Sequence, residues 1–202
     1  MTDIIDPYID SIVRTEPACA MYLLKHYFIV ETQPSETRSA RLAYGWYTKY
    51  KIPDLDVFYK GRNIQIEVKA YDEYTPYPIY SSLGKGGLIK NLKGWDRFNK
   101  LKELGFEQGL DKYEVDRLLK WQQCKYWIPI LVAFNDFHLR TWDNGNGLWY
   151  GTRLGEFIQN GRKATYQGKT QYFLRIALMK PIEQVIKDAV SLTNIAMHLP
   201  QL

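Results

Sequence analysis

The strongest constraint on the fold of this chain is an alternating pattern on both sides of a short turn, PDLDVFYKGRNIQIEVK at residues 53–69. Apolar residues occupy every second position before the turn and again after it: Leu55, Val57, Tyr59, then Ile64, Ile66, Val68. Successive side chains of a strand point to opposite faces, so the pattern predicts a β-hairpin with one apolar face. The apolar faces align only if paired residue numbers add up to an odd total, such as 121 or 123, because a one-residue slip exchanges the two faces.

The same registers gather charged residues on the other face of the hairpin, namely Asp54, Asp56, Glu67 and Lys69. Carboxylates at close range repel one another, and a divalent cation removes that repulsion. Oxygen ligands suit Mg²⁺, which can polarise a phosphate and activate a bound water, while a nearby lysine stabilises developing negative charge. The alternative interpretation is a solvated hairpin with ordinary charged residues near its turn.

Pro53-Asp54 followed by Glu67-Val68-Lys69 on the next strand resembles the motif of the PD-(D/E)XK nucleases. The resemblance implies a metal-dependent hydrolase that cuts DNA. It implies that Asp54 and Glu67 are catalytic residues that bind Mg²⁺, for which Mn²⁺ could substitute, and that Lys69 is the catalytic lysine. It also implies a restriction-endonuclease-like α/β core, with a mixed central β-sheet flanked by α-helices.

Two further residues are candidates for catalytic roles by the same resemblance. Many members of the family carry a glutamate on the helix before the hairpin, and Glu36 fits best, with Glu31 as second choice. Glu36 can equally be a first-turn acid favoured by the helix dipole. Gln122 and Tyr126 resemble the Gln-x-x-x-Tyr pair of recombination exonucleases, and helical spacing turns Gln122 inward with Val115. A buried amide bonded to the backbone explains Gln122 as well.

The net charge of +5 is matched by one window, Lys85 to Lys102, which holds six cations and the single acid Asp96. This window follows the predicted catalytic strand and contains several glycines, which would let the backbone approach DNA closely. It therefore predicts phosphate contacts, from Lys85, Lys90, Lys93 and Arg97. The alternative is a solvated loop.

The order of predicted elements indicates one α/β nuclease domain over residues 1–202, with the motif core at about 35–135 and additions at both ends. We expect helices over residues 8–30, 33–47, 95–105 and 111–124, and a last helix from Pro181. We expect a central strand over 126–134, two strands around an Asn-Gly turn over 139–151, and a strand over 172–179.

The sequence favours an intracellular, cytoplasmic enzyme, since Cys19 and Cys124 are too few for a disulfide framework and no apolar run is long enough for a membrane span. The predicted function is a site-specific endodeoxyribonuclease of restriction or homing type acting on double-stranded DNA. Two strand cuts and one site per chain favour a homodimer or higher oligomer. The alternatives are a Holliday-junction resolvase, a recombination-type exonuclease, and an inactive DNA-binding module with the nuclease fold.

Overall fold

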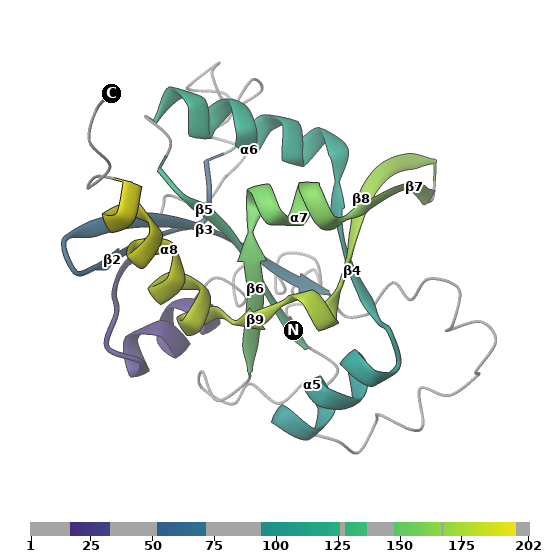
Figure 1. The fold of residues 1–202 in the computed structure, drawn as a ribbon, viewed down its shortest axis with the longest axis horizontal. Helices are drawn as coiled ribbons and strands as arrows, with labels where there is room; N and C mark the ends of the chain where they lie inside the picture. The colour runs from purple at the N-terminus through teal and green to yellow at the C-terminus, as the bar shows by residue number, and fades with distance from the viewer. Residues whose placement is uncertain are drawn as a thin grey trace, which may run out of the picture.

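The computed structural model of the chain describes residues 17–32, 52–71, 94–125, 128–136, 148–166 and 168–196. Its central feature is a six-stranded sheet in the order β1-β2-β3-β5-β6-β9 (Figure 1). The strands are β1 (Ile29–Thr32), β2 (Leu55–Tyr59), β3 (Arg62–Tyr71), β5 (Ile130–Asp136), β6 (Trp149–Arg153) and β9 (Lys180–Pro181). β3 and β5 are parallel and the other pairs are antiparallel, so the predicted mixed sheet is confirmed.

The hairpin forms in one of the two registers that the apolar pattern predicts. Leu55 pairs with Ile66 and Val57 with Ile64, so paired numbers add up to 121. Lys60 and Gly61 make the turn with φ values of 49° and 73°. Two consecutive residues with positive φ are typical of the two-residue turn whose twist matches that of the flanking strands.

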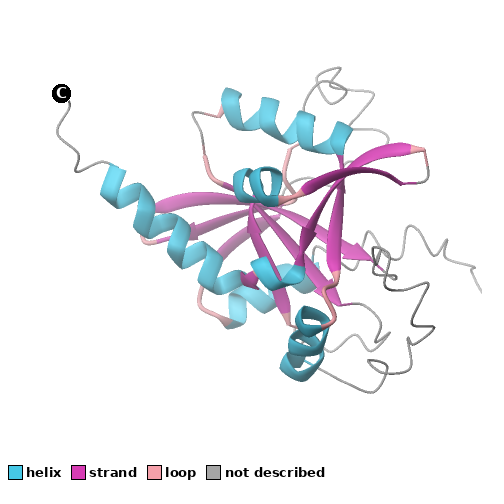
Figure 2. Ribbon diagram, turned by 45° about the vertical axis from the view of Figure 1, so that its right-hand side comes forward, coloured by secondary structure: helices cyan, strands magenta, loops and turns pink. Residues whose placement is uncertain are grey.

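Helices cover both faces of this sheet (Figure 2). They are a helical segment at residues 17–25, then α5 (Gly94–Glu103), α6 (Lys112–Cys124), α7 (Leu154–Asn160) and α8 (Ile182–Ala196). α6 begins after Asp111, whose carboxylate accepts a hydrogen bond of 2.8 Å from the Tyr113 N–H as an N-cap. The helices predicted at 95–105, at 111–124 and after Pro181 are confirmed. None of the described helices is long and apolar enough to cross a membrane.

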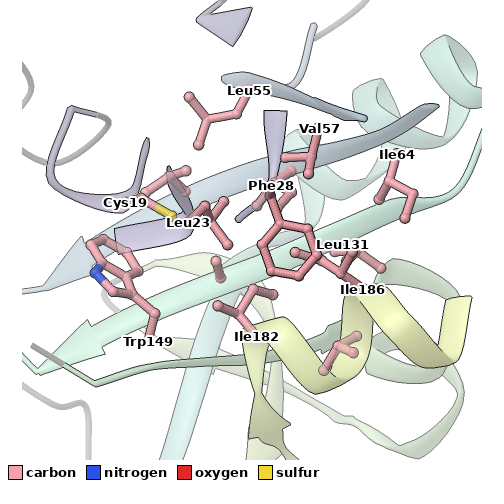
Figure 3. Packing of buried hydrophobic residues seen from close by; sticks show 14 of the residues in the cluster. Cys19, Leu23, Phe28, Leu55, Val57, Ile64, Leu131, Trp149, Ile182 and Ile186 are labelled. Carbon is pink, nitrogen blue, oxygen red and sulfur yellow. The ribbon is translucent and has the colours of Figure 1, made fainter. Parts of the chain in front are cut away.

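The sheet separates two apolar clusters. On one face, Leu55, Val57 and Ile64 pack with Ile182 and Ile186 of α8 and with the helical segment at 17–25 (Figure 3). On the other face, side chains of β5 and β6 pack with α5, α6 and α7. The central strands are therefore buried on both sides, and so are the polar side chains that β3 directs towards α6.

A second, three-stranded sheet was not predicted. Its order is β4-β8-β7, formed by β4 (Glu107–Asp111), β7 (Arg162–Tyr166) and β8 (Lys169–Arg175). The strand predicted over 172–179 is wrong after Arg175, because the chain turns into a 3-10 helix at Ile176–Leu178. That turn is fixed by the Ile176 N–H, which donates to the Phe106 carbonyl over 2.8 Å. The helix predicted over 33–47, the first strand of 139–151 and the glycine-rich part of the basic window lie outside the described residues.

Candidate active site

Asp54 lies immediately before β2 and opposite Glu67 in the register of the hairpin. The N–H of Gln65 points towards β5, where it donates to the Pro129 carbonyl. Because N–H groups alternate in direction along a strand, the N–H of Val68 points towards the β2 side, past the first β2–β3 pair, Leu55 with Ile66. The Asp54 carboxylate accepts that Val68 N–H over 2.7 Å. The Asp54 side chain thus accepts a hydrogen bond from a main-chain N–H that has no partner residue in the paired part of β2. This bond fixes the carboxylate next to Val68, the residue between Glu67 and Lys69.

Glu67 and Lys69 project from β3 towards α6. The Glu67 side chain has 0% exposure, and the Lys69 ammonium lies 2.5 Å from its Oε1 atom. Lys69 also donates to the Glu114 carboxylate, which comes from the first turn of α6. A charge is costly to bury unless it is paired, so the Lys69 ammonium between two carboxylates is what makes a buried Glu67 tolerable.

Asp56 has a different environment from Asp54. It is 8% exposed, and its Oδ1 atom accepts a hydrogen bond of 2.9 Å from the amide of Gln65, its partner across the hairpin. The side-chain Oε1 atom of Gln65 in turn accepts a hydrogen bond of 2.9 Å from the indole N–H of Trp121 on α6. Asp56 therefore belongs to a hydrogen-bonded chain that ties the hairpin to α6, whereas Asp54 is bonded to the backbone at Val68.

Asp54 also influences the other face of the sheet. Burial raises the pKa of the Cys19 thiol well above its usual value, and the negative charge of Asp54 raises it further. Cys19 belongs to the apolar cluster. Because the thiolate is the reactive form, this cysteine is a packing residue.

Gln122 is not brought to this cluster by any described contact. Its amide donates to the Ile128 carbonyl over 3.0 Å, closing the end of α6 onto the segment before β5. Gln122 is eight residues after Glu114, which corresponds to roughly 12 Å along a helix. Tyr126, its predicted partner, lies outside the described residues.

The other predicted residues contribute little to the described geometry. Glu31 lies on β1, where it pairs with Asp56. Glu36, Lys85, Lys90 and Lys93 lie outside the described residues, and of Arg97 only its place in α5 is described.

Glu114 and Trp121 were missed by the sequence analysis. They are seven residues apart on α6, and they contact Lys69 and Gln65, which are four residues apart on β3. Seven residues of helix and four residues of strand both span roughly 10 to 13 Å, so the two pairs form one polar seam. The signal in the sequence was the seven-residue spacing, which puts both side chains on one helix face.

Asp54 and Glu67 are the residues of this cluster that could hold a hard divalent cation. Asp54 and Glu67 offer carboxylate oxygens, and the Glu67 oxygens already lie beside the positive charge of Lys69. In the described part of the chain no group of three or more His, Cys, Asp or Glu side chains is arranged to hold a metal ion. Mg²⁺ retains several waters and is commonly bound through only one or two carboxylates, so the carboxylates of Asp54 and Glu67 would be enough in number to hold it.

Comparison with known proteins gives a weak structural likeness. No protein-family model matches the sequence, and no curated protein matches it. Among solved structures, that of D212, a nuclease from a fusselovirus, is similar with a TM-score of 0.39 and 11% sequence identity, over 84% of this chain and 81% of that chain. A likeness at this level carries no argument about family or activity.

Proposed function

We propose that this protein is a metal-dependent endodeoxyribonuclease with a restriction-endonuclease-like core. The observation that carries the proposal is the arrangement at one end of the hairpin. There, Asp54 is bonded to the Val68 N–H, and the Lys69 ammonium lies between the buried Glu67 and Glu114. Burying an acid costs free energy unless the acid is paired, and functional sites are where proteins commonly bring such charged groups together.

In this proposal Asp54 and Glu67 would hold Mg²⁺, with Mn²⁺ able to substitute. The ion would supply polarisation of a phosphate and a water of lowered pKa. Lys69 would orient that water or stabilise the negative charge that develops on the phosphate oxygens. Glu114 would keep the Lys69 side chain in position, since it is bonded to the same ammonium from the facing helix.

The proposed substrate is double-stranded DNA, cut at specific sites as restriction and homing enzymes do, by a homodimer or higher oligomer. A Holliday-junction resolvase remains the nearest alternative. The exonuclease alternative depended on Gln122, and the observed bond of that amide to the Ile128 carbonyl gives it no added support. An inactive DNA-binding module with the same fold is the alternative from another class.

The deciding experiment incubates the purified chain with Mg²⁺ and four substrates: supercoiled plasmid, linear duplex, single strand and four-way junction. We expect cutting of duplex DNA in Mg²⁺ or Mn²⁺ and none in EDTA. Glu67→Gln, which removes a charge and keeps the shape, should lower the rate about 100-fold or more, by analogy with the loss of one stabilising group at an active site. Glu103→Gln is a matched control, because Glu103 is 66% exposed and paired only across the surface of α5.

The outcomes separate the alternatives. Cutting that persists in EDTA would exclude the metal mechanism, and wild-type rates in Glu67→Gln would exclude the residue assignment. Preference for the four-way junction would identify a resolvase, and shortening from free ends would identify an exonuclease. Binding to duplex DNA without any cutting, in either metal, would identify the inactive module.

A further inference from the structure

The ribbon formed by β7, its turn and β8, residues 162–175, concentrates positive charge on the second sheet. It contains Arg162, Lys163, Lys169 and Arg175 and no aspartate or glutamate. Nothing in the sequence analysis singled it out, because acids elsewhere in the chain cancel its charge in the total. In the folded protein, charge acts where it is placed in space.

One of these cations has a structural role. Arg162 bonds Glu107 with its Nη2 atom 2.6 Å from a carboxylate oxygen, and its guanidinium lies 4.6 Å from the centre of the Phe173 ring. Arg162 therefore fastens the base of the ribbon to β4 and β8. Lys163, Lys169 and Arg175 are exposed.

The end of the ribbon narrows to two strands. β4 pairs with β8 only as far as Asp111 opposite Gln171, whereas β7 and β8 continue through Thr165 opposite Thr170 to the turn at Gly168. The two-stranded part from Gln171 to Gly168 is roughly 10 Å long at the usual rise of a strand. The major groove of DNA is about 12 Å wide and 8.5 Å deep, and it admits a two-stranded ribbon.

The side chains at this end suit a groove that has phosphates on both walls. By the alternation along paired strands, Lys163, Thr165 and Thr170 lie on one face, and Lys169 lies on the other. Lys169 is 73% exposed, with Asp111 at 3.9 Å offsetting part of its charge. The exposed threonines are neutral hydrogen-bonding groups at the end, where base edges would lie.

The ribbon also starts beside the candidate active site. Asp111 pairs with Gln171 of β8 and is the N-cap of α6, whose first turn carries Glu114, the partner of Lys69. Figure 1 shows β7 and β8 projecting beside the beginning of α6, and Figure 2 shows the same from another direction. The ribbon and the Lys69 cluster are thus joined through one helix turn.

We propose that the β7–β8 ribbon is a duplex-DNA contact that enters the major groove next to the candidate active site, with Lys163 and Lys169 on phosphates. The proposal rests on the proposed nuclease function for its substrate, and it adds the surface that holds the duplex. It concerns binding, so it can be tested apart from cleavage.

The test uses fluorescence anisotropy with a labelled duplex of mixed sequence, in EDTA, across a range of salt concentrations, with all variants in the Glu67→Gln background. Each lysine that neutralises a phosphate adds about 0.9 to the slope of log affinity against log salt. Lys163→Ala/Lys169→Ala should therefore reduce that slope by about 1.8, equivalent to roughly 60-fold weaker binding at 0.1 M salt if the effect vanishes near 1 M. The matched control is Lys60→Ala/Lys187→Ala, which removes two exposed lysines from the far hairpin turn and from α8.

The proposal would be supported if the slope of log affinity against log salt falls in the ribbon variant and stays the same in the control. Both variants should also melt at the temperature of the Glu67→Gln parent. Equal losses in the two double variants would overturn it, because the attraction would then be general. Equal or larger losses on duplex RNA would also overturn it, since the A-form major groove is too narrow for the ribbon. If the wild-type chain cuts DNA in Mg²⁺, and the ribbon variant keeps the slope of the Glu67→Gln parent, the ribbon proposal alone fails. If the wild-type chain neither binds nor cuts DNA in Mg²⁺, the proposed function fails with it.

Discussion

The two faces of β3 are buried to a similar degree and yet are built on opposite principles. Towards α8, Ile64, Ile66 and Val68 are 1%, 0% and 6% exposed. Towards α6, Gln65 and Glu67 are 4% and 0% exposed. Burial alone therefore does not distinguish the two faces; the chemistry of their partners does.

The apolar face is stabilised by any apolar side chains that fill the space, because moving an aliphatic side chain out of water is favourable. On the polar face each buried group requires a specific hydrogen-bond or ion-pair partner, since an unpaired buried charge or amide is costly. Gln65 has Asp56 and Trp121, and Glu67 has Lys69. One strand can therefore stabilise the fold through its apolar face and, on its other face, position charged side chains for the proposed reaction.

The largest expected effect on stability belongs to the apolar face. Ile66→Ala removes a fully buried side chain at the centre of the sheet and should lower the free energy of unfolding by about 3 kcal/mol. Urea denaturation measures this directly. Cleavage per folded molecule should be unchanged, since Ile66 points away from the cluster. A loss below about 1 kcal/mol would show that this face is loosely packed and would weaken the comparison.

A smaller loss is expected when the charge balance of the polar face is broken. Lys69→Met leaves Glu67 buried without its ammonium partner and should cost about 2 kcal/mol in EDTA, less than for a fully enclosed pair because Lys69 is 17% exposed. The double variant Glu67→Gln/Lys69→Met should recover most of the loss, because it removes both charges.

The control for this prediction is Lys180→Met, which breaks a pair with Asp188 in which the lysine is 61% exposed. Its effect should stay within about 0.5 kcal/mol. If the double variant is no more stable than Lys69→Met alone, the buried charge of Glu67 is not the cause of the loss, and the polar face is held by other contacts.

Asp54 and Asp56 test where the chemistry of the polar face lies. Calorimetric titration with Mn²⁺ should show at least tenfold weaker binding to Asp54→Asn. Loss of a residue that only supports a metal ligand already lowers metal affinity about tenfold or more, and loss of a ligand should lower it at least as much. Asp56→Asn should change affinity by less than about threefold, while lowering the free energy of unfolding by about 1 kcal/mol, because a neutral amide oxygen is a weaker acceptor for the Gln65 amide than a carboxylate. The reverse ranking would move the metal ligand two residues along the strand.

The smallest effect is expected at the exposed pair between Lys180 of β9 and Asp188 of α8, and its pH dependence has a definite sign. The hydrogen bond from Lys180 lowers the pKa of Asp188, partial burial opposes this, and the hydrogen bond from Gln184 adds to the lowering. Because the pKa is depressed in the folded state, the stabilisation is present above the unfolded value of about 3.9 and is lost as the pH falls through the folded value. Asp188→Asn should therefore cost about 0.5 kcal/mol at pH 7.

Urea denaturation at pH 7, 5 and 3 checks this sign. The difference between Asp188→Asn and the parent should shrink between pH 5 and 3. A difference that grows on acidification would mean that Asp188 is destabilised in the folded protein, contrary to its hydrogen bonds.

Local patterns predicted the parts of the fold that depend on near neighbours. Alternation restricted the hairpin to registers with an odd total, and Lys60-Gly61 supplied the turn that selects the total of 121. Asp111 marked the start of α6, because an N-cap bonds within its own first turn. The second sheet escaped prediction because β4, EQGLD, has no alternation and owes its strand form to β8, some 60 residues later.

The sequence by itself determined that Asp54, Glu67 and Lys69 share one face of the hairpin, because strand periodicity and the alignment of the apolar faces are set within a single hairpin. Only the tertiary structure decided that Glu114 meets Lys69 and that Trp121 meets Gln65. These contacts join segments 45 and 56 residues apart. How a helix lies across a sheet depends on the packing of the whole core between them, and no local pattern carries that information.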